Sequence, residues 1–154
     1  MAERLTPQRF EGDWQGQRVG LFTLEHPSGM SAAICNLGAK VLQWRVPSAQ
    51  GPLVDVCLGY QSLQEVLSGA PSMGAFIARY AGRIGQSCYE LQGWSWTLPA
   101  NDGAHCLHGG PMGSRHRVFQ VLAHDRDRLV LGLRLSNALD GHPGEVDLKV
   151  SYRW

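Results

Sequence analysis

The clearest regularity in the chain is the alternation of apolar and polar residues near its end. Residues 146–154 read Val-Asp-Leu-Lys-Val-Ser-Tyr-Arg-Trp, with an apolar side chain at every second position. Residues 129–135 repeat this pattern with four leucines. Because side chains on a β-strand point alternately to the two faces of a sheet, such alternation is typical of strands with one buried face. The two segments therefore predict neighbouring strands.

Turn residues separate further strand-like segments along the chain. We predict a hairpin of strands 19–25 and 32–35 around the turn 27–29, then a strand at 41–46 and, after the turn 47–52, another at 54–58. A second hairpin joins strands 89–91 and 94–98 around Gln92-Gly93. A strand at 118–122 is expected to pair with 129–135 through the polar run 124–128. In the strand at 41–46, alternation places Leu42, Trp44 and Val46 on one face. These segments follow one another through short turns, which favours antiparallel hairpins.

Helix signals are few. Residues 62–67 form one candidate turn of helix, because Ser62 and Glu65 have the spacing of a capping box. The chain has 19 glycines and 8 prolines among 154 residues, which favours turns elsewhere. The order of short strands predicts an all-β fold, an antiparallel β-sandwich formed as a single domain over residues 1–154.

Composition narrows the classes of function. A net charge of +1 gives no basic patch for nucleic acid or an anionic membrane. The chain has no run of about 18 apolar residues, and its charged N-terminal segment lacks the apolar core of a secretory signal. Four widely spaced cysteines (Cys35, Cys57, Cys88 and Cys106) predict reduced thiols in or near the core. We therefore expect a cytoplasmic protein without nucleic-acid or membrane partners.

The loop at residues 101–113 carries the most informative chemistry. It reads Asn-Asp-Gly-Ala-His-Cys-Leu-His-Gly-Gly-Pro-Met-Gly, and its four glycines and one proline exclude a helix interior. Glycines beside His108 let the backbone approach a ligand closely, and an imidazole with an ordinary pKa of about 6.5 exchanges protons near neutrality. His108 is therefore a candidate for proton transfer on a small molecule. The alternative interpretation is a tight turn with a surface histidine.

The same loop raises the question of a metal site. His105, Cys106 and His108 are too close together in sequence to match a closed structural zinc site, so we expect no metal. A metal-binding β-barrel that uses His105, His108 and His116 is a competing hypothesis. It lacks a carboxylate spaced with the histidines, which such sites usually include.

A series of short motifs resembles the aldose 1-epimerases, or galactose mutarotases. The motifs, in chain order, are Asn36-Leu37-Gly38-Ala39, Val46-Pro47, Asp55-Val56-Cys57-Leu58-Gly59-Tyr60, Arg79-Tyr80-Ala81-Gly82-Arg83-Ile84, Asn101-Asp102-Gly103, Leu107-His108-Gly109-Gly110 and Gly141-His142-Pro143-Gly144. Their order matches that family over residues 20–154, which is more specific than any single motif.

The resemblance implies a large antiparallel β-sandwich, a supersandwich of which this chain would form part, with a sugar on its concave face. It also implies cofactor-free interconversion of the α and β anomers of free aldohexoses such as galactose or glucose. In this family the base is a glutamate near the C-terminus, and the acid is a histidine in a His-x-Tyr-Phe segment. Both would lie beyond Trp154, so the resemblance covers the N-terminal half of such an enzyme.

Two residues carry the family's site into this chain. His108 matches the histidine that acts near the ring oxygen and anomeric centre in this family, so it is the catalytic candidate. His108 and Arg83 are the substrate-binding candidates. A guanidinium such as that of Arg83 can donate a fork of hydrogen bonds to adjacent sugar hydroxyls. Arg79 is expected to satisfy local backbone or carboxylate groups instead. Departures from the family are Gly82 and His105, where asparagine is usual, and His142, where an aromatic residue is common.

The runner-up hypothesis is a catalytically inactive carbohydrate-binding module. Trp44, Trp94 or Trp96 could stack on a sugar in such a module, although their alternation with polar residues favours the core. In either case the expected partner is a hexose.

Half of a large sandwich would also leave an open strand edge near residues 146–154, which predicts a homodimer or association with the missing half.

Overall fold

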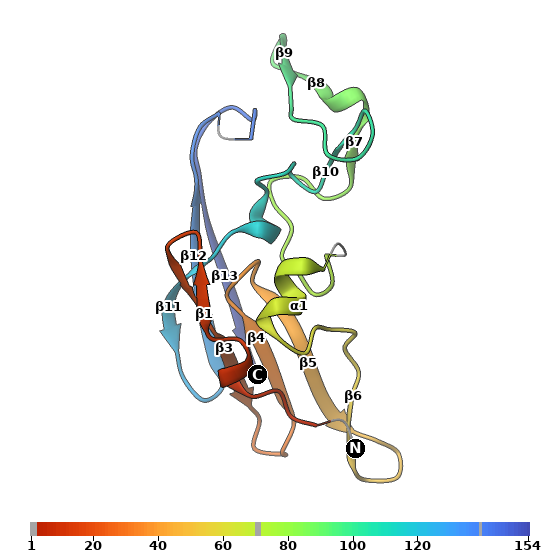
Figure 1. Cartoon of the computed structure of the whole chain (residues 1–154), viewed down its shortest axis with the longest axis vertical. Helices are drawn as coiled ribbons and strands as arrows, with labels where there is room; N and C mark the ends of the chain where they lie inside the picture. Colours follow the sequence, from red (N-terminus) through yellow and green to blue (C-terminus); the bar gives the residue numbers. More distant parts are fainter. Residues whose placement is uncertain (1–2, 70–71, 139) are drawn as a thin grey trace.

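The computed structural model describes residues 3–69, 72–138 and 140–154, which form two main antiparallel sheets and a smaller group of hairpins (Figure 1). The strands are β1 (Gly12–Trp14), β2 (Gln17–Val19), β3 (Leu21–Glu25), β4 (Ser31–Cys35), β5 (Lys40–Pro47), β6 (Leu53–Asp55), β7 (Arg83–Ile84), β8 (Cys88–Leu91), β9 (Trp94–Thr97), β10 (Cys106–Leu107), β11 (Gln120–His124), β12 (Arg128–Leu135) and β13 (Val146–Arg153). One α-helix, α1 (Leu63–Ser68), and three 3₁₀ turns, η1 (Pro7–Arg9), η2 (Gly85–Ser87) and η3 (Ser114–His116), complete the described elements.

The two main sheets face each other across an apolar core. One sheet has the order β3-β4-β5-β6 and the other β11-β12-β13. Leu24 and Ile34 of the first sheet belong to the same buried cluster as Phe119, Leu129 and Leu131, which lie in or beside the second sheet. Burying both inner faces is the main driving force for this arrangement. The predicted all-β, antiparallel sandwich is thereby confirmed.

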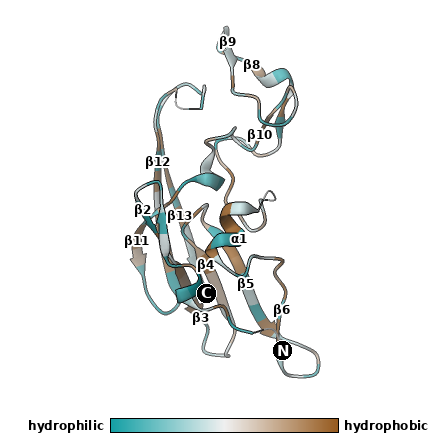
Figure 2. Ribbon diagram, viewed as in Figure 1, coloured by the Kyte–Doolittle hydropathy of each residue, from teal (hydrophilic) through white to brown (hydrophobic). Residues whose placement is uncertain are grey.

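A second core covers the opposite face of the β3-β4-β5-β6 sheet. Leu21 and Ala33 pack there with Phe10 from the N-terminal segment and Val66 from α1. The hydrophobic positions of α1 appear brown in Figure 2. The predicted helix cap is present, because Ser62 Oγ accepts the Glu65 N–H at 3.3 Å. The four-stranded sheet is therefore covered on both faces.

The predicted hairpins are confirmed, including the tight turn between β8 and β9. Gln92 and Gly93 have φ values of 54° and 79°, as a two-residue turn with left-handed residues requires. The β7–β10 pair and the β8–β9 hairpin extend beyond the end of the sandwich (Figure 1). Among the strands that the structure describes, β13 pairs with β12 alone and forms the edge of its sheet, as expected.

Two details of the strand predictions are wrong. A β-bulge shifts the register so that Ala33 pairs with Gln43 while Ile34 pairs with Val41. Leu42 therefore joins the core beneath α1, whereas Trp44 packs in the core between the sheets, and the two do not share a face. The strand expected at 54–58 ends at Asp55.

Asp55 explains that early end. Its Oδ1 accepts the N–H groups of both Trp44 and Cys57 at 3.0 Å, so at Trp44 a side chain takes the place of the backbone acceptor that a continuing strand would supply. The side chains of Val56 and Leu58 beyond it are exposed. No helix in the described part of the chain is long and apolar enough to cross a membrane.

Candidate functional site

Pairing between two short strands places the candidate residues next to each other. Leu107 of β10 lies opposite Arg83 of β7, and His108 follows β10 directly. The His108 N–H donates to the Gly82 carbonyl at 3.0 Å, which continues this pairing by one residue. The motifs that contain Arg83 and His108 are 25 residues apart in sequence, and β7–β10 pairing brings them together.

The His108 ring is held by the same backbone. Its Nδ1 accepts the Gly82 N–H at 3.1 Å, so the neutral ring carries its proton on Nε2. His108 has φ 54° and Gly82 has φ 90°, both in the left-handed region. A Cβ added at Gly82 would meet no atom within 4 Å, so space alone does not exclude the family's asparagine there.

Electrostatics keeps this imidazole neutral. Burial lowers the pKa of His108, and the positive charges of Arg115 and Arg83 lower it further. The Gly82 N–H that faces Nδ1 acts in the same direction, because it bonds only to the deprotonated nitrogen. At neutral pH His108 is therefore a hydrogen-bond donor through Nε2.

The Asn101-Asp102-Gly103 turn holds both strands of the site. Asn101 accepts the Leu107 N–H at 2.6 Å and donates to the Leu107 carbonyl at 3.0 Å, which fixes β10. Arg83 Nε donates to Asp102 Oδ2. The side chain of Arg83 is 60% exposed, and its two terminal nitrogens have no hydrogen-bond partner among the described residues. The motifs alone do not reveal that Asn101 holds β10 or that Asp102 holds the Arg83 guanidinium.

A cavity of about 420 Å³ lies beside Arg83. Its walls are formed by Arg79, Tyr80, Arg83, Ile84, Gly85, Tyr89 and His142. His108 is not among these residues, although the charge of Arg83 acts on it. The structure therefore puts Arg83 on the cavity wall and His108 on the adjoining strand.

Arg79 and His142 form another part of that cavity's wall. The Arg79 guanidinium donates to the carbonyls of Leu135, Ser136 and Pro143 at 2.9–3.2 Å, in agreement with the expected local role. His142 is only 7% exposed, its Nδ1 lies 3.2 Å from the Tyr89 hydroxyl, and its Nε2 has no partner within the described residues. In the sequence, His142 stands out only as a departure from the family.

A buried histidine of this kind makes stability depend on pH. Burial and the charge of Arg79 lower the pKa of His142 in the folded state, so the unfolded chain takes up this proton first as pH falls. Its stabilising contribution is complete above an ordinary histidine pKa of about 6.5 and is lost as pH falls through the lowered value.

We predict that His142→Tyr, which restores an aromatic residue, flattens the loss of stability below about pH 6.5. Urea unfolding of both proteins at several pH values between neutrality and about pH 5 measures this slope. Parallel curves for the two proteins would show that His142 does not titrate with unfolding.

The other sequence-based candidates are dispersed. His105 Nδ1 accepts the Gln86 N–H at 3.2 Å, and no group of three or more metal-ligating side chains occurs in the described ranges. The metal hypothesis based on His105, His108 and His116 thus finds no support. Trp44 is half-buried and packs against the core between the sheets, but Trp94 is 71% exposed, contrary to expectation.

The cysteines partly follow expectation. All four are free thiols, and Cys35 and Cys106 are buried. Cys88 is exposed, so the expected core or near-core position is wrong for it. Its strand, β8, belongs to the hairpin beyond the sandwich, which leaves little to cover it (Figure 1).

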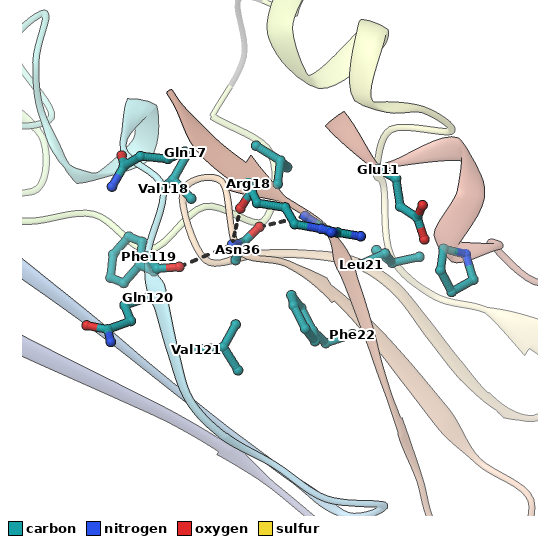
Figure 3. A pocket seen from close by; sticks show the side chains of 13 residues that line it. Glu11, Gln17, Arg18, Leu21, Phe22, Asn36, Val118, Phe119, Gln120 and Val121 are labelled. Carbon is teal, nitrogen blue, oxygen red and sulfur yellow. Dashed lines mark hydrogen bonds between the residues drawn. The ribbon is translucent and has the colours of Figure 1, made fainter. Parts of the chain in front are cut away.

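A larger cavity of about 500 Å³ lies between the open edges of the two sheets, at β3 and β11 (Figure 3). At its base, Asn36 donates to the carbonyls of Arg18 and Phe119 at 3.1 Å and accepts the Gly20 N–H at 2.9 Å. The nitrogen and the oxygen of this side-chain amide both have hydrogen-bond partners, and the bonds connect the two layers. The described residues that line this cavity include neither Arg83 nor His108, so it is separate from the candidate sugar site.

Comparison with known proteins agrees with the motif order. A family profile described as Aldose 1-epimerase matches residues 20–153. The Escherichia coli K12 aldose 1-epimerase is 33% identical over 138 residues, which cover 90% of this chain and 40% of that enzyme. The Sus scrofa galactose mutarotase is 32% identical over 123 residues, 77% of this chain and 34% of the relative.

Solved structures show the same fold. The GalM/aldose epimerase homologue from C. elegans superimposes with a TM-score of 0.84 at 30% identity, covering 88% of this chain and 42% of that one. The galactose 1-epimerase from Lactobacillus acidophilus gives a TM-score of 0.79 at 23% identity, covering 93% and 42%. The chain therefore spans about 40% of the length of the curated relatives it matches. The match over most of its residues shows that the chain belongs to the aldose 1-epimerase family.

Proposed function

We propose that this chain supplies part of the sugar site of an aldose 1-epimerase, which interconverts the α and β anomers of free aldohexoses such as galactose or glucose. The observation that carries the proposal is the double hydrogen bond between Gly82 and His108, which leaves a proton on Nε2 beside the strand of Arg83. In this proposal Arg83 donates to sugar hydroxyls, and His108 donates near the ring oxygen and anomeric centre.

The chemistry requires two coordinated proton transfers. A base removes the proton from the anomeric hydroxyl while an acid protonates the ring oxygen, and the C1–O5 bond breaks to give the aldehyde. Rotation about C1–C2 and reclosure with the reverse transfers yield the other anomer. A hydrogen bond from neutral His108 would stabilise negative charge that develops on oxygen during this step. No cofactor takes part in the proposed reaction.

In the proposed reaction, this chain supplies His108 and Arg83 but not the acid that the family uses. The 154 residues contain no His-x-Tyr-Phe segment, so the acid of the family is not among them. We propose that residues 1–154 act as one domain in the cytoplasm, where four free thiols would persist. An inactive carbohydrate-binding module is not favoured, because the relatives at 30% identity or more carry epimerase or mutarotase names. Anomer exchange of galactose, measured by NMR after joining this chain to the part of the E. coli aldose 1-epimerase that it does not cover, with and without His108→Ala, tests the proposal.

The free edge of β13 predicts self-association of the isolated chain. Val150 and Tyr152 of this strand face the core, whereas its outer edge has no described neighbour. An uncovered edge offers unpaired N–H and C=O groups to a second strand. We expect a concentration-dependent homodimer in sedimentation velocity experiments. A single monomeric species up to high concentration would contradict this prediction.

A further inference from the structure

A small cavity on the α1 side of the four-stranded sheet is surrounded by basic groups. It measures about 50 Å³ and is bordered by Lys40, Ser72, Arg115 and His116, with Trp14 and Leu67 on its apolar side. None of these residues borders the cavity at Arg83. The family motifs do not include Lys40 or Arg115 in the sugar site, so this cluster has no assigned role.

Lys40 is the most buried of these groups, with only 5% of its surface exposed. Its Nζ donates to the Arg115 carbonyl at 2.6 Å and, at the longer distance of 3.4 Å, to the Leu37 carbonyl. An ammonium group has three N–H donors, so one remains for another acceptor. A Cβ added at Gly38 would lie 2.4 Å from this Nζ, so the glycine makes room for the charged group.

Arg115 also has a free donor at the cavity. Its Nη1 donates to Ser72 Oγ at 2.7 Å, but its buried Nε has no hydrogen-bond partner among the described residues. Leaving a buried charged donor unsatisfied is costly. Lys40 and Arg115 therefore present two donors with positive charge to one small space.

The cluster has no acidic counterpart. No aspartate or glutamate borders the cavity, and the five residues outside the described ranges are Met1, Ala2, Ala70, Pro71 and Leu139, which carry no carboxyl side chain. Burial, together with a smaller effect of the charge of Arg115, lowers the pKa of Lys40 to about 8, yet the group remains mostly protonated at pH 7. Positive charge is thus concentrated here without neutralisation by the chain.

We propose that this cavity binds a small inorganic oxyanion, such as phosphate or sulfate, through Lys40 Nζ, Arg115 Nε and Ser72 Oγ, with His116 at the rim. Charge-assisted bonds from a guanidinium and an ammonium group are the strongest available to a tetrahedral oxyanion. The cavity has room for a few waters or one such anion. This inference does not depend on the proposed sugar chemistry.

Titration of the whole chain with inorganic phosphate, at constant ionic strength in a non-coordinating buffer, tests the proposal. We expect saturable binding by calorimetry and a saturable shift of the Arg115 Nε–H signal in ¹⁵N NMR spectra. Arg115→Gln should weaken binding about tenfold or more, the size expected for one lost charge-assisted bond. Arg128→Gln removes the same charge from an exposed strand position and should leave binding unchanged.

The proposal is overturned if phosphate binding is absent or never saturates. It is also overturned if Arg115→Gln binds phosphate as tightly as the unmodified chain, or if both variants lose binding equally. Circular dichroism of Arg115→Gln checks that the variant is folded. If it is not, His116→Ala at the exposed rim replaces it, with weaker binding expected and unchanged affinity contradicting the site.

Discussion

The isolated chain is expected to leave the exchange between α- and β-galactose close to its rate in buffer. Ring opening needs an acid and a base acting together, and each proton transfer contributes about 10²–10⁴ in rate. Of the groups that the family uses, the chain contains the candidate donor His108 and the candidate binding residue Arg83. Magnetisation-exchange NMR or optical rotation of fresh α-galactose measures the rate.

Joining this chain to the part of the E. coli aldose 1-epimerase that it does not cover should restore exchange. In that chimera, His108→Ala should lower the rate by about 10²–10⁴, because it removes the donor held by Gly82. His105→Ala removes a second histidine of the same loop and should have a much smaller effect. Equal losses for the two variants would argue against a specific role for His108.

Strong catalysis by the unmodified isolated chain would contradict this account. It would mean that an acid and a base already lie within residues 1–154. Glu90, Glu145, His105 and His142 would be the first residues to test in that case. Glu145 forms an ion pair with Arg134 at 3.4 Å, so its removal would also disturb that contact.

A large loss of stability is expected when Phe119, in the core between the sheets, is replaced by alanine. Phe119 is fully buried and meets Phe76 edge-on, with ring centroids 6.3 Å apart. Phe119→Ala should lower the free energy of unfolding by about 3–5 kcal/mol, the cost of removing a buried aromatic side chain and leaving a cavity. This is a large share of the roughly 5–15 kcal/mol that holds a typical domain folded.

Leu122→Ala is the matched control for that measurement. Leu122 lies three residues further along the chain, on the outer face of the same sheet, and half of its surface is exposed. We expect its change in unfolding free energy to stay within about 0.5 kcal/mol, as for most surface substitutions. Urea unfolding followed by circular dichroism compares the two variants. Equal destabilisation would contradict the assignment of Phe119 to the core between the layers.

Much of the fold was predictable because alternation reports which face of a strand is buried. This worked for β12 and β13, which pair with each other in regular antiparallel register without a bulge. It failed at Leu42, because a bulge depends on the partner strand and leaves no period in the local sequence. It also failed at Trp94, whose hairpin alternates but has no layer packed over it.

The site was predictable only as far as the motifs reached. They identified Arg83 and His108, but not that Gly82 fixes the imidazole or that Asp102 holds the guanidinium. The contact of His142 with Tyr89 joins residues 53 positions apart, which no local pattern reveals. Lys40 lies in an ordinary strand sequence, and only the structure shows that its ammonium group is buried.

Arg83 and His108 are expected to contact one hexose. Titration of the isotopically labelled chain with galactose, followed by the NMR signals of the Arg83 Nε–H and the His108 ring, tests this contact. We predict saturable shifts of both signals at the same sugar concentration, while the His105 ring stays unchanged and Arg83→Gln abolishes the His108 shift. If galactose moves neither signal, or if the His108 shift persists unchanged in Arg83→Gln, the two residues do not form one sugar site.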